Sequence, residues 1–340
     1  MRKLLNTLYI TTCDAYLSKD GMNVVISVNQ NEIFRIPIIN IEGIVTFGYM
    51  GASPGLMKLC ADNGVSLCFL SPNGKYIGRF QGPVKGNVLL RTRQLNLSQD
   101  THFALNLSRL FIAGKIQNYR NILARFLRDN GENHTITTVI SHLNNSKQNA
   151  FKASTFDELR GLEGDAASLY FSMFPHLILH QKQDFIFNGR NRRPPKDAVN
   201  AMLSFVYTLI ASEVSSALEA VGLDPYVGFF HTLRPGRTSL ALDMMEELRA
   251  YLGDRLVLSL INRKQISIHD FVPQGEDGVV MTEEGRKIIL TAWQSRKRET
   301  FTHPYLGEKI SIGLLPHVQA MMLARYLRGD IDNYPVFLIN

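Results

Sequence analysis

The sequence is poor in cysteine, and it lacks the motifs of several common protein classes. Its 340 residues include three cysteines, Cys13, Cys60 and Cys68, none of them in a CxxC spacing. A structural zinc site is therefore not expected. We interpret the three cysteines as buried free thiols in a reducing compartment. Neither a P-loop nor a GxGxxG motif is present, and there is no internal repeat or low-complexity tract.

Long hydrophobic runs are also missing. No apolar stretch reaches the length that we take a membrane span to require. The first residues, MRKLLNTLYITT, start with positive charge but alternate polar and apolar side chains and have no cleavage site. They predict a first strand rather than a signal peptide. We therefore expect a cytoplasmic protein.

The remaining composition is that of a globular, mildly basic protein. Hydrophobic residues make up 45% of the chain and charged residues 20%, and the length is enough for two domains of ordinary size. The formal net charge of +7 is consistent with a polyanionic partner. It is equally consistent with a globular protein that happens to be basic.

The pattern of the first eighty residues predicts a small β-rich domain over residues 1–81. Asp20-Gly21 and Asn73-Gly74 each stand between two strand-like runs, as the turn of a hairpin does. Ser53 and Pro54 are typical of the start of a helix, which we expect to end at Asn63. No His, Asp and Glu side chains converge here, so packing or dimerisation is the expected role.

Residues 82–88 fit neither the two-residue period of a strand nor the 3.6-residue period of a helix, and they predict a linker. Residues 89–340 then follow the helical period. The fold class is therefore α+β, with a small β-rich domain followed by a larger all-α domain. In residues 103–128, Lys115 and several arginines interleave with apolar residues. This pattern favours a solvated basic helix face, with a phosphate-facing surface as the alternative. Residues 130–146 are polar and predict a short helix and a loop.

The most informative stretch is GFFHTLRPGRTSLALDMMEELR, residues 228–249. His231 precedes a Pro-Gly turn, and a helix then begins near Thr238 or Ser239. Asp243 and Glu246 are three residues apart on that helix, so they can point at one spot. An imidazole and carboxylates that converge would suit Mn²⁺ or Mg²⁺. The alternative is a mostly buried helix with one solvated acidic edge.

Two further segments carry unusual residues. A helix that starts with the capping box of Thr155 and Glu158 has Gly161 and Gly164 on either side of Glu163. Each glycine costs the helix roughly 1 kcal/mol relative to alanine, which close approach of another helix or of a substrate strand would explain. The second segment is the loop at 187–197. Its clustered arginines can bind phosphates, although a solvated loop is the ordinary interpretation.

These three segments, in this order, resemble the CRISPR-associated Cas1 family. The family has a histidine before a Pro-containing turn and then an Asp-x-Met-Glu helix, which correspond here to His231, Asp243 and Glu246. Residues 160–167, RGLEGDAA, match the family's Arg-Gly-x-Glu-Gly-x-Ala-Ala segment. The loop at 190–200 resembles its Arg-x-Arg-Pro-Pro-x-Asp-x-x-Asn loop, of which residues 193–200 match the part from the second arginine to the asparagine. Where the family often continues with Pro-Phe-Arg, this chain has Glu-Leu-Arg at 247–249.

The resemblance implies a metal-dependent DNA endonuclease and integrase of spacer acquisition. It implies that Glu163, His231 and Glu246 bind Mn²⁺ or Mg²⁺, with Asp243 as an auxiliary acid. It also implies a homodimer formed through the first domain, a Cas2 partner, and double-stranded and branched DNA as substrate. Non-catalytic DNA binding and a metal-dependent RNase remain alternatives. The residues expected near DNA are Arg190, Arg192, Arg193, Lys196, Asn200, Arg234 and Arg237.

Overall fold

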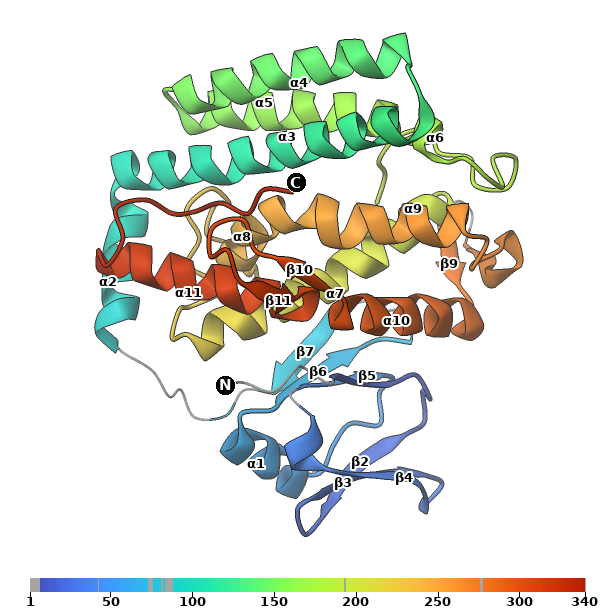
Figure 1. Cartoon of the computed structure of the whole chain (residues 1–340). Coiled ribbons are helices and arrows are strands. Elements are labelled where there is room, and N and C mark those ends of the chain that lie inside the picture. Colours follow the sequence, from blue (N-terminus) through green and yellow to red (C-terminus); the bar gives the residue numbers. More distant parts are fainter. Residues whose placement is uncertain are drawn as a thin grey trace.

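The computed structural model describes residues 7–41, 43–72, 76–80, 82, 88–192, 194–275 and 278–339. The first eighty residues form strands and one helix, and they lie below a larger, mostly helical body (Figure 1). Residues 1–6 of the expected first strand, the turn at Asn73-Gly74 and most of the expected linker lie outside the described residues.

Seven strands of the N-terminal part form two sheets. The antiparallel sheet has the order β2 (Tyr16–Asp20), β3 (Asn23–Val28), β4 (Asn31–Pro37). The other has the order β1 (Thr7–Ile10), β5 (Gly43–Phe47), β6 (Ser66–Leu70), β7 (Tyr76–Phe80). In it β1, β5 and β6 are parallel and β7 is antiparallel to β6. The hairpin predicted at Asp20-Gly21 is confirmed, because Asp20 pairs with Asn23.

Helix α1 (Pro54–Asn63) is confirmed with both of its predicted ends. The hydroxyl of Ser53 accepts a hydrogen bond from the backbone N–H of Leu56 at 3.2 Å. Gly64 ends the helix in the left-handed conformation, with φ of 67°. A side chain other than glycine rarely adopts this conformation, so the local sequence fixes this helix end.

The four-stranded sheet joins the two parts of the molecule, because its two faces belong to different cores. Ile44 and Leu67 pack with α1 and the three-stranded sheet. The alternating neighbours Val45 and Phe47 face the helical body instead, where the Phe47 ring lies 5.8 Å from that of Phe205. A strand that is buried on both faces explains why β5 has no polar side.

The helical body consists largely of ten α-helices among the described residues. They are α2 (Val88–Gln99), α3 (Thr101–Asn130), α4 (His134–Lys152), α5 (Phe156–Ser172), α6 (Phe174–Leu177), α7 (Ala198–Ala220), α8 (Ser239–Arg249), α9 (Arg255–Asn262), α10 (Glu283–Arg298) and α11 (Leu315–Arg328). Helices α3, α4 and α5 lie side by side at the top of Figure 1. A π-helical turn, Ala250–Asp254, joins α8 to α9.

One expectation about this region is wrong. The polar stretch 130–146 is not a short helix and a loop: Asn130 ends α3, and residues 134–146 belong to the longer α4, because Asn133 caps that helix and Ile136, Val139 and Leu143 bury one stripe of it. The expected order, a β-rich part followed by a mostly helical region, is confirmed, although that region is not helical throughout. It contains two small antiparallel sheets, made of β8 (Phe271–Gln274) with β9 (Gly278–Met281) and β10 (Thr300–Thr302) with β11 (Lys309–Ser311).

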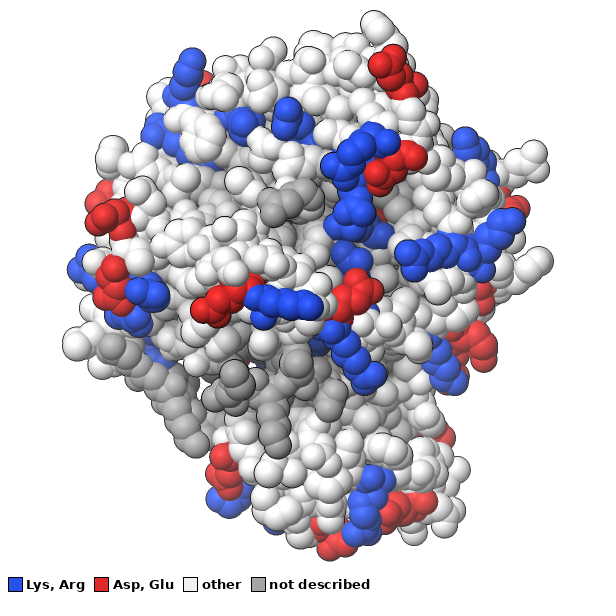
Figure 2. Space-filling view, viewed as in Figure 1, with Lys and Arg blue, Asp and Glu red and all other residues white. Residues whose placement is uncertain are grey.

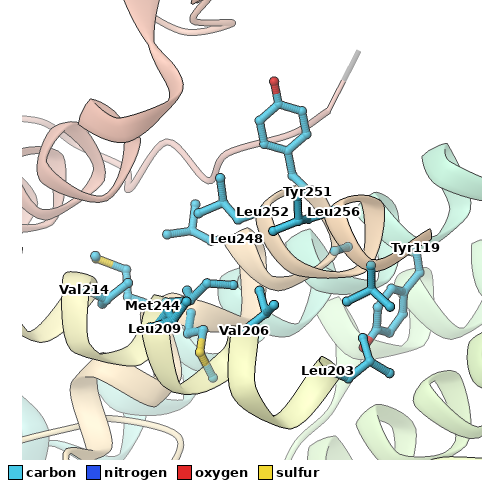
Figure 3. Close-up of a cluster of buried hydrophobic side chains, with 14 of the residues drawn as sticks. Tyr119, Leu203, Val206, Leu209, Val214, Met244, Leu248, Tyr251, Leu252 and Leu256 are labelled. Carbon is cyan, nitrogen blue, oxygen red and sulfur yellow. The ribbon is translucent and has the colours of Figure 1, made fainter. Parts of the chain in front are cut away.

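Helix α7 is the central helix of the body. It is the one described helix that is long and apolar enough, by length and composition, to cross a membrane, which corrects the expectation that no run is that long. However, 61% of its most apolar window is buried inside the protein. The buried side chains Leu203, Val206 and Leu209 of α7 lie in one apolar cluster with Met244 and Leu248 of α8 (Figure 3). The packing of α7 therefore fixes the position of α8.

Candidate functional site

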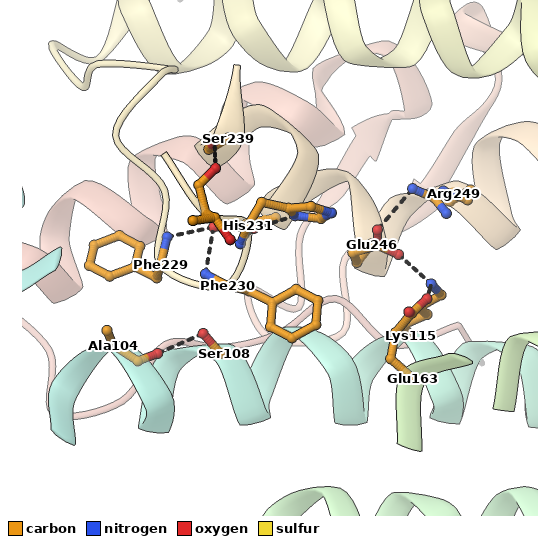
Figure 4. Close-up of polar contacts among 12 residues, drawn as sticks. Ala104, Ser108, Lys115, Glu163, Phe229, Phe230, His231, Ser239, Glu246 and Arg249 are labelled. Atoms are coloured by element: carbon orange, nitrogen blue, oxygen red, sulfur yellow. Dashed lines mark hydrogen bonds and ion pairs between the residues drawn. The ribbon is translucent and has the colours of Figure 1, made fainter. Parts of the chain in front are cut away.

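Asp243 of α8 is buried and holds the segment that carries His231. Its carboxylate accepts hydrogen bonds from the backbone N–H groups of Phe229, Phe230 and His231, at 2.6, 3.0 and 2.9 Å. It also lies 2.6 Å from Nδ1 of the His231 ring (Figure 4). A carboxylate at Nδ1 favours the proton on that nitrogen, so Nε2 keeps its lone pair for a ligand.

Gly228 is required for this arrangement. A Cβ at this position would lie 2.8 Å from Oδ2 of Asp243 and 2.7 Å from the carbonyl carbon of Ser239. Both distances are shorter than real Cβ contacts, and one partner is backbone. The glycine at the start of the motif therefore allows the chain to approach Asp243 closely.

The second centre of the site is Lys115 of α3, whose ammonium group contacts two carboxylates. It forms ion pairs with Glu163 of α5 and, at 2.7 Å, with Oε2 of Glu246 of α8 (Figure 4). The other oxygen of Glu246 lies 2.8 Å from Arg249. The side chain of Lys115 is 1% exposed and that of Glu246 is 4% exposed, whereas that of Glu163 is 27% exposed. The cluster therefore opens to solvent on the side of Glu163.

The charges of this cluster stabilise one another. Burial raises the pKa of Glu246, but the opposing effects of Arg249, Lys115 and His231 lower it to about 2. Burial lowers the pKa of Lys115, yet Glu246, Tyr119 and Glu163 raise it above the usual range. Glu246 and Lys115 are thus both ionised at neutral pH, although both are buried.

The ring of Tyr207, on α7, lies against the guanidinium group of Arg249. The guanidinium of Arg249 lies 4.9 Å from the centre of the Tyr207 ring, and that of Arg190 lies 5.4 Å from it. The Tyr207 hydroxyl donates a 2.5 Å hydrogen bond to Asp254. Burial raises the pKa of Asp254 to about 6, against the lowering effects of Tyr207 and Arg249. These aromatic and polar contacts hold Arg249 against Glu246.

The structure brings the predicted ligands together only in part. Glu163 and Glu246 meet at one nitrogen, and His231 is close enough for its charge to lower the pKa of Glu246. Asp243 and Glu246 do not point at one spot, because Asp243 turns to His231 and Glu246 turns to Lys115. In the described part of the chain, no three His, Cys, Asp or Glu side chains are placed to hold an ion as they stand.

Lys115 is the residue of the site that the sequence analysis missed, because we had placed it on a solvated basic face. Its burial contradicts that expectation. A signal was nevertheless present in the sequence. Phe111 and Tyr119 lie four residues before and after Lys115, so the helical period puts the lysine on the core face of α3. A lysine within an apolar stripe indicates a buried carboxylate partner.

The two glycines beside Glu163 do not serve close packing between helices. Gly161 and Gly164 are exposed, and a Cβ at either position would have no atom within 4 Å in the described structure. The face of α5 next to Glu163 is therefore smooth and open. Of the two explanations offered for the glycines, approach of a substrate strand is the one that remains.

The arginine loop divides into an internal part and an exposed part. Arg190 donates hydrogen bonds to the carbonyl of Asn191, to Asn200 and to Ser204. Asn200 is fully buried and also donates to Asp197, so the expectation that it contacts DNA is wrong: it fixes the loop. The exposed members of the predicted set are Arg192, Lys196 and Arg234; Arg237 is half-buried, and Arg193 lies outside the described residues.

Comparison with known proteins identifies the family. The sequence model described as CRISPR associated protein Cas1 matches residues 8–295. The CRISPR-associated endonuclease Cas1 1 of Chlorobaculum tepidum is 49% identical, with 99% of each chain covered. The CRISPR-associated endonuclease Cas1 2 of Rhodospirillum rubrum is 46% identical, with 98% of each covered.

Solved structures agree on the fold. A CAS1 protein from Thermotoga maritima superposes with a TM-score of 0.82 at 24% identity, covering 98% of this chain and all of the other. The structure titled "Casposase bound to integration product" has a TM-score of 0.83 at 22% identity, covering 99% of this chain and 96% of the other. The order of the elements, the segments around Glu163 and His231, and the two close relatives together show that this chain belongs to the Cas1 family.

Proposed function

We propose that this protein is a metal-dependent DNA endonuclease and integrase that inserts short DNA fragments into a CRISPR array. The observation that carries the proposal is the pair of carboxylates from α5 and α8 that share one cationic nitrogen beside an oriented histidine. The printed names of the two relatives, both CRISPR-associated endonucleases, support it. The casposase structure, which holds an integration product, supports the strand-joining activity.

The residues fit a divalent cation. The ammonium group of Lys115 contacts both Glu163 and Glu246, so a cationic group already lies between the two carboxylates. The buried Oε2 of Glu246 has an ion pair but no hydrogen bond of good geometry. Glu163, Glu246 and Nε2 of His231 would hold Mn²⁺ or Mg²⁺, a donor set of oxygen and imidazole that suits either ion. When bound, the ion would polarise a phosphodiester and stabilise the charge that develops on its oxygens.

The protein side chains prepare the site rather than form a covalent intermediate. Asp243 keeps the His231 ring in one tautomer and orientation, and Arg249 holds one oxygen of Glu246. No side-chain nucleophile is needed. Attack by water gives cleavage, and attack by a DNA 3′-hydroxyl gives strand joining. Each reaction forms one P–O bond and breaks another, so strand joining needs no external energy source.

The proposal includes the assembly of the protein. Residues 1–81 form the domain that pairs two subunits, residues 82–88 form the linker, and residues 89–340 form the catalytic domain. Among the residues that the structure describes, nine of the 21 exposed large hydrophobic ones lie in the first eighty positions, which favours an interface there. A fold neighbour described as a Cas6-RT-Cas1–Cas2 complex supports a Cas2 partner. In this proposal the residues that contact DNA are Arg192, Arg193 and Lys196 of the loop at 187–197, together with Arg234 and Arg237 before α8.

Replacing the carboxylates tests the proposed function. Glu163→Gln and Glu246→Gln should each abolish Mn²⁺-dependent cleavage and strand joining on branched DNA. Both variants should bind DNA in metal-free buffer as tightly as the wild type or more tightly, because a carboxylate that repels phosphate is gone. Asp165→Asn is the matched control, since this exposed carboxylate lies on the same helix as Glu163.

Three outcomes would contradict the proposal. Full cleavage by both variants would remove the metal-site assignment. Equal loss of binding and cleavage would indicate a structural role for the acids, as in a DNA-binding scaffold. Preferential cleavage of an RNA strand of the same sequence would favour the RNase.

A further inference from the structure

Residues 331–339, which we call the C-terminal segment, lie against α3 and α8 without forming helix or strand (Figure 1). Asn118, a fully buried side chain of α3, connects the three. Its Nδ2 donates hydrogen bonds to the backbone carbonyls of Glu247 and Phe337, at 2.8 and 2.9 Å. Its Oδ1 accepts one from the backbone N–H of Ile339 at 2.9 Å. One side chain of α3 therefore binds both α8 and the C-terminal segment.

Glu247 of α8 binds the same segment with its carboxylate. This fully buried group accepts hydrogen bonds from the Tyr334 hydroxyl and, at 3.0 Å, from the amide of Gln319 on α11. Its second oxygen accepts a 2.6 Å hydrogen bond from the backbone N–H of Phe337. Buried polar groups of this kind need protein donors in place of water. Glu247 is also the position at which this chain departs from the family's usual proline, which has no side-chain acceptor.

The C-terminal segment approaches α3 so closely that one position of the helix has to be glycine. A Cβ at Gly114 would lie 2.1 Å from Cγ1 of Val336, which is far inside van der Waals contact. Gly114 is buried in the middle of the 30-residue helix, where helix propensity alone would favour alanine. The glycine therefore serves the close approach of the segment, and it directly precedes Lys115.

Aromatic contacts complete the attachment of the segment. The Phe337 ring lies 5.3 Å from that of Tyr251 and 5.8 Å from that of Phe301. The Tyr334 ring lies 5.4 Å from that of Phe111 on α3. Tyr334 and Phe337 are each 2% exposed. The surface between α3 and α11, where the segment lies, shows few charged side chains (Figure 2). Burial and hydrogen bonds thus hold the segment in place.

These contacts lie next to the carboxylate cluster on both helices. Asn118 follows Lys115 by three residues, about one turn of α3, and Glu247 directly follows Glu246 on α8. Successive residues of a helix point about 100° apart, so Glu246 faces Lys115 while Glu247 faces the C-terminal segment. The segment therefore joins the two helices beside their ion pair. A shift of α8 would move Glu246 relative to Glu163.

We propose that the C-terminal segment is a positioning element of the candidate active site, which holds α8 through Glu247 and Asn118 so that Glu246 stays opposite Glu163. This inference rests on the proposed function, because it concerns the place of a metal ligand. Residues that orient a ligand without touching the ion contribute about 10–100-fold to metal affinity or activity. A misplacement of about 1 Å can cost roughly 100-fold in rate. Loss of the contacts of the segment should therefore appear in Mn²⁺ affinity and kcat, and not in KM for DNA.

A steric clash and its relief test the proposal in the full chain. Gly114→Ala should push Val336 away and weaken Mn²⁺ binding, measured by isothermal titration calorimetry, by about tenfold or more. The kcat of Mn²⁺-dependent cleavage of branched DNA should fall with it, while KM for the DNA stays that of the wild type. Val336→Ala removes Cγ1 and leaves the Cβ of residue 336 at 3.5 Å from the new methyl group, an ordinary contact. The double variant should therefore regain the Mn²⁺ affinity and kcat of the wild type.

Two single variants complete the set. Val336→Ala alone should behave as the wild type, because other residues make the hydrogen bonds of the segment. Tyr334→Phe is the milder change if Gly114→Ala does not fold, since it removes only the hydroxyl that donates to Glu247. It should weaken Mn²⁺ binding by a smaller factor and increase amide hydrogen exchange at Phe337. Tyr305→Phe, at an exposed tyrosine of the helical body, is its matched control and should change neither.

Two results would overturn the inference. If every folded variant of this set keeps wild-type Mn²⁺ affinity and kcat, whatever its melting temperature, the segment only stabilises the fold. If the defect of Gly114→Ala persists in a folded double variant, the effect does not pass through the C-terminal segment. A wild type that neither binds Mn²⁺ nor cleaves DNA would contradict the proposed function itself, and the inference would fall with it.

Discussion

The ammonium nitrogen of Lys115 lies 2.7 Å from Oε2 of Glu246 and also contacts Glu163, so one side chain of α3 joins the carboxylates of α8 and α5. Two buried or half-buried carboxylates would repel each other without a cation between them. The lysine supplies that cation within the protein itself. A divalent ion that binds the same carboxylates must therefore compete with Lys115 or displace it.

Replacing Lys115 with methionine should separate the stability of the metal-free protein from its affinity for metal. The metal-free variant should lose about 3–5 kcal/mol of folding stability, because a buried ion pair loses one partner. Addition of Mn²⁺ should then raise its melting temperature more than that of the wild type, since no ammonium group competes for the carboxylates. Thermal melts with and without Mn²⁺ measure both effects. An equal rise in the two proteins would show that Lys115 does not occupy the cation position.

Replacing Asp243 with asparagine should weaken metal binding although Asp243 is not a predicted ligand. The carboxylate fixes the His231 ring and accepts three backbone hydrogen bonds, and an amide can accept only with its oxygen. A loss of 10–100-fold in Mn²⁺ affinity is expected. Isothermal titration calorimetry with Mn²⁺ measures this affinity, with Asp165→Asn as the control. Wild-type affinity in the variant would mean that the orientation of His231 does not matter for the ion.

The buried carboxyl of Asp254 should make stability depend on pH in a defined window. Its folded pKa of about 6 is above the ordinary value of 3.8, so the folded state keeps a proton that the unfolded state releases near pH 4. Stability therefore falls as the pH rises from about 4 to 6 and is level above that. The shift corresponds to roughly 3 kcal/mol. Asp254→Asn removes this contribution, so the difference in free energy of unfolding between wild type and variant should change across that window. A constant difference from pH 4 to 7.5 would contradict the shift.

The proposed dimer interface should depend on the most exposed apolar residues of the first domain. Ile39 is 81% exposed and Tyr49 is 76% exposed, which is costly for a surface that stays in water. Ile39→Asp with Tyr49→Asp should convert a dimer to a monomer in light scattering, with no loss of melting temperature. Tyr305→Asp, which changes an exposed residue of the helical body, is the control. A variant that remains dimeric would place the interface elsewhere.

The sequence by itself determined the features that depend on near neighbours. The hairpin at Asp20-Gly21 and the start of α1 at Ser53 follow from turn and capping preferences that act over a few residues. The caps of α5 at Thr155 and of α7 at Asp197 have the same local cause. The two motifs that carry Glu163 and the pair His231 and Glu246 could be recognised for the same reason, because each is contained in a short segment.

Tertiary structure alone decided which side chains meet. Lys115 and Glu246 are far apart in the sequence and meet because α3 packs against α8, which no local pattern states. The ring of Tyr251 likewise contacts Arg255, one turn further along the chain, and Arg296, which belongs to a separate helix. An arginine in a motif can therefore be internal, as Arg190 is, because its hydrogen-bond partners Asn200 and Ser204 belong to the protein. Charge and periodicity indicate that a side chain can bind an anion, but packing decides whether its partner belongs to the protein itself.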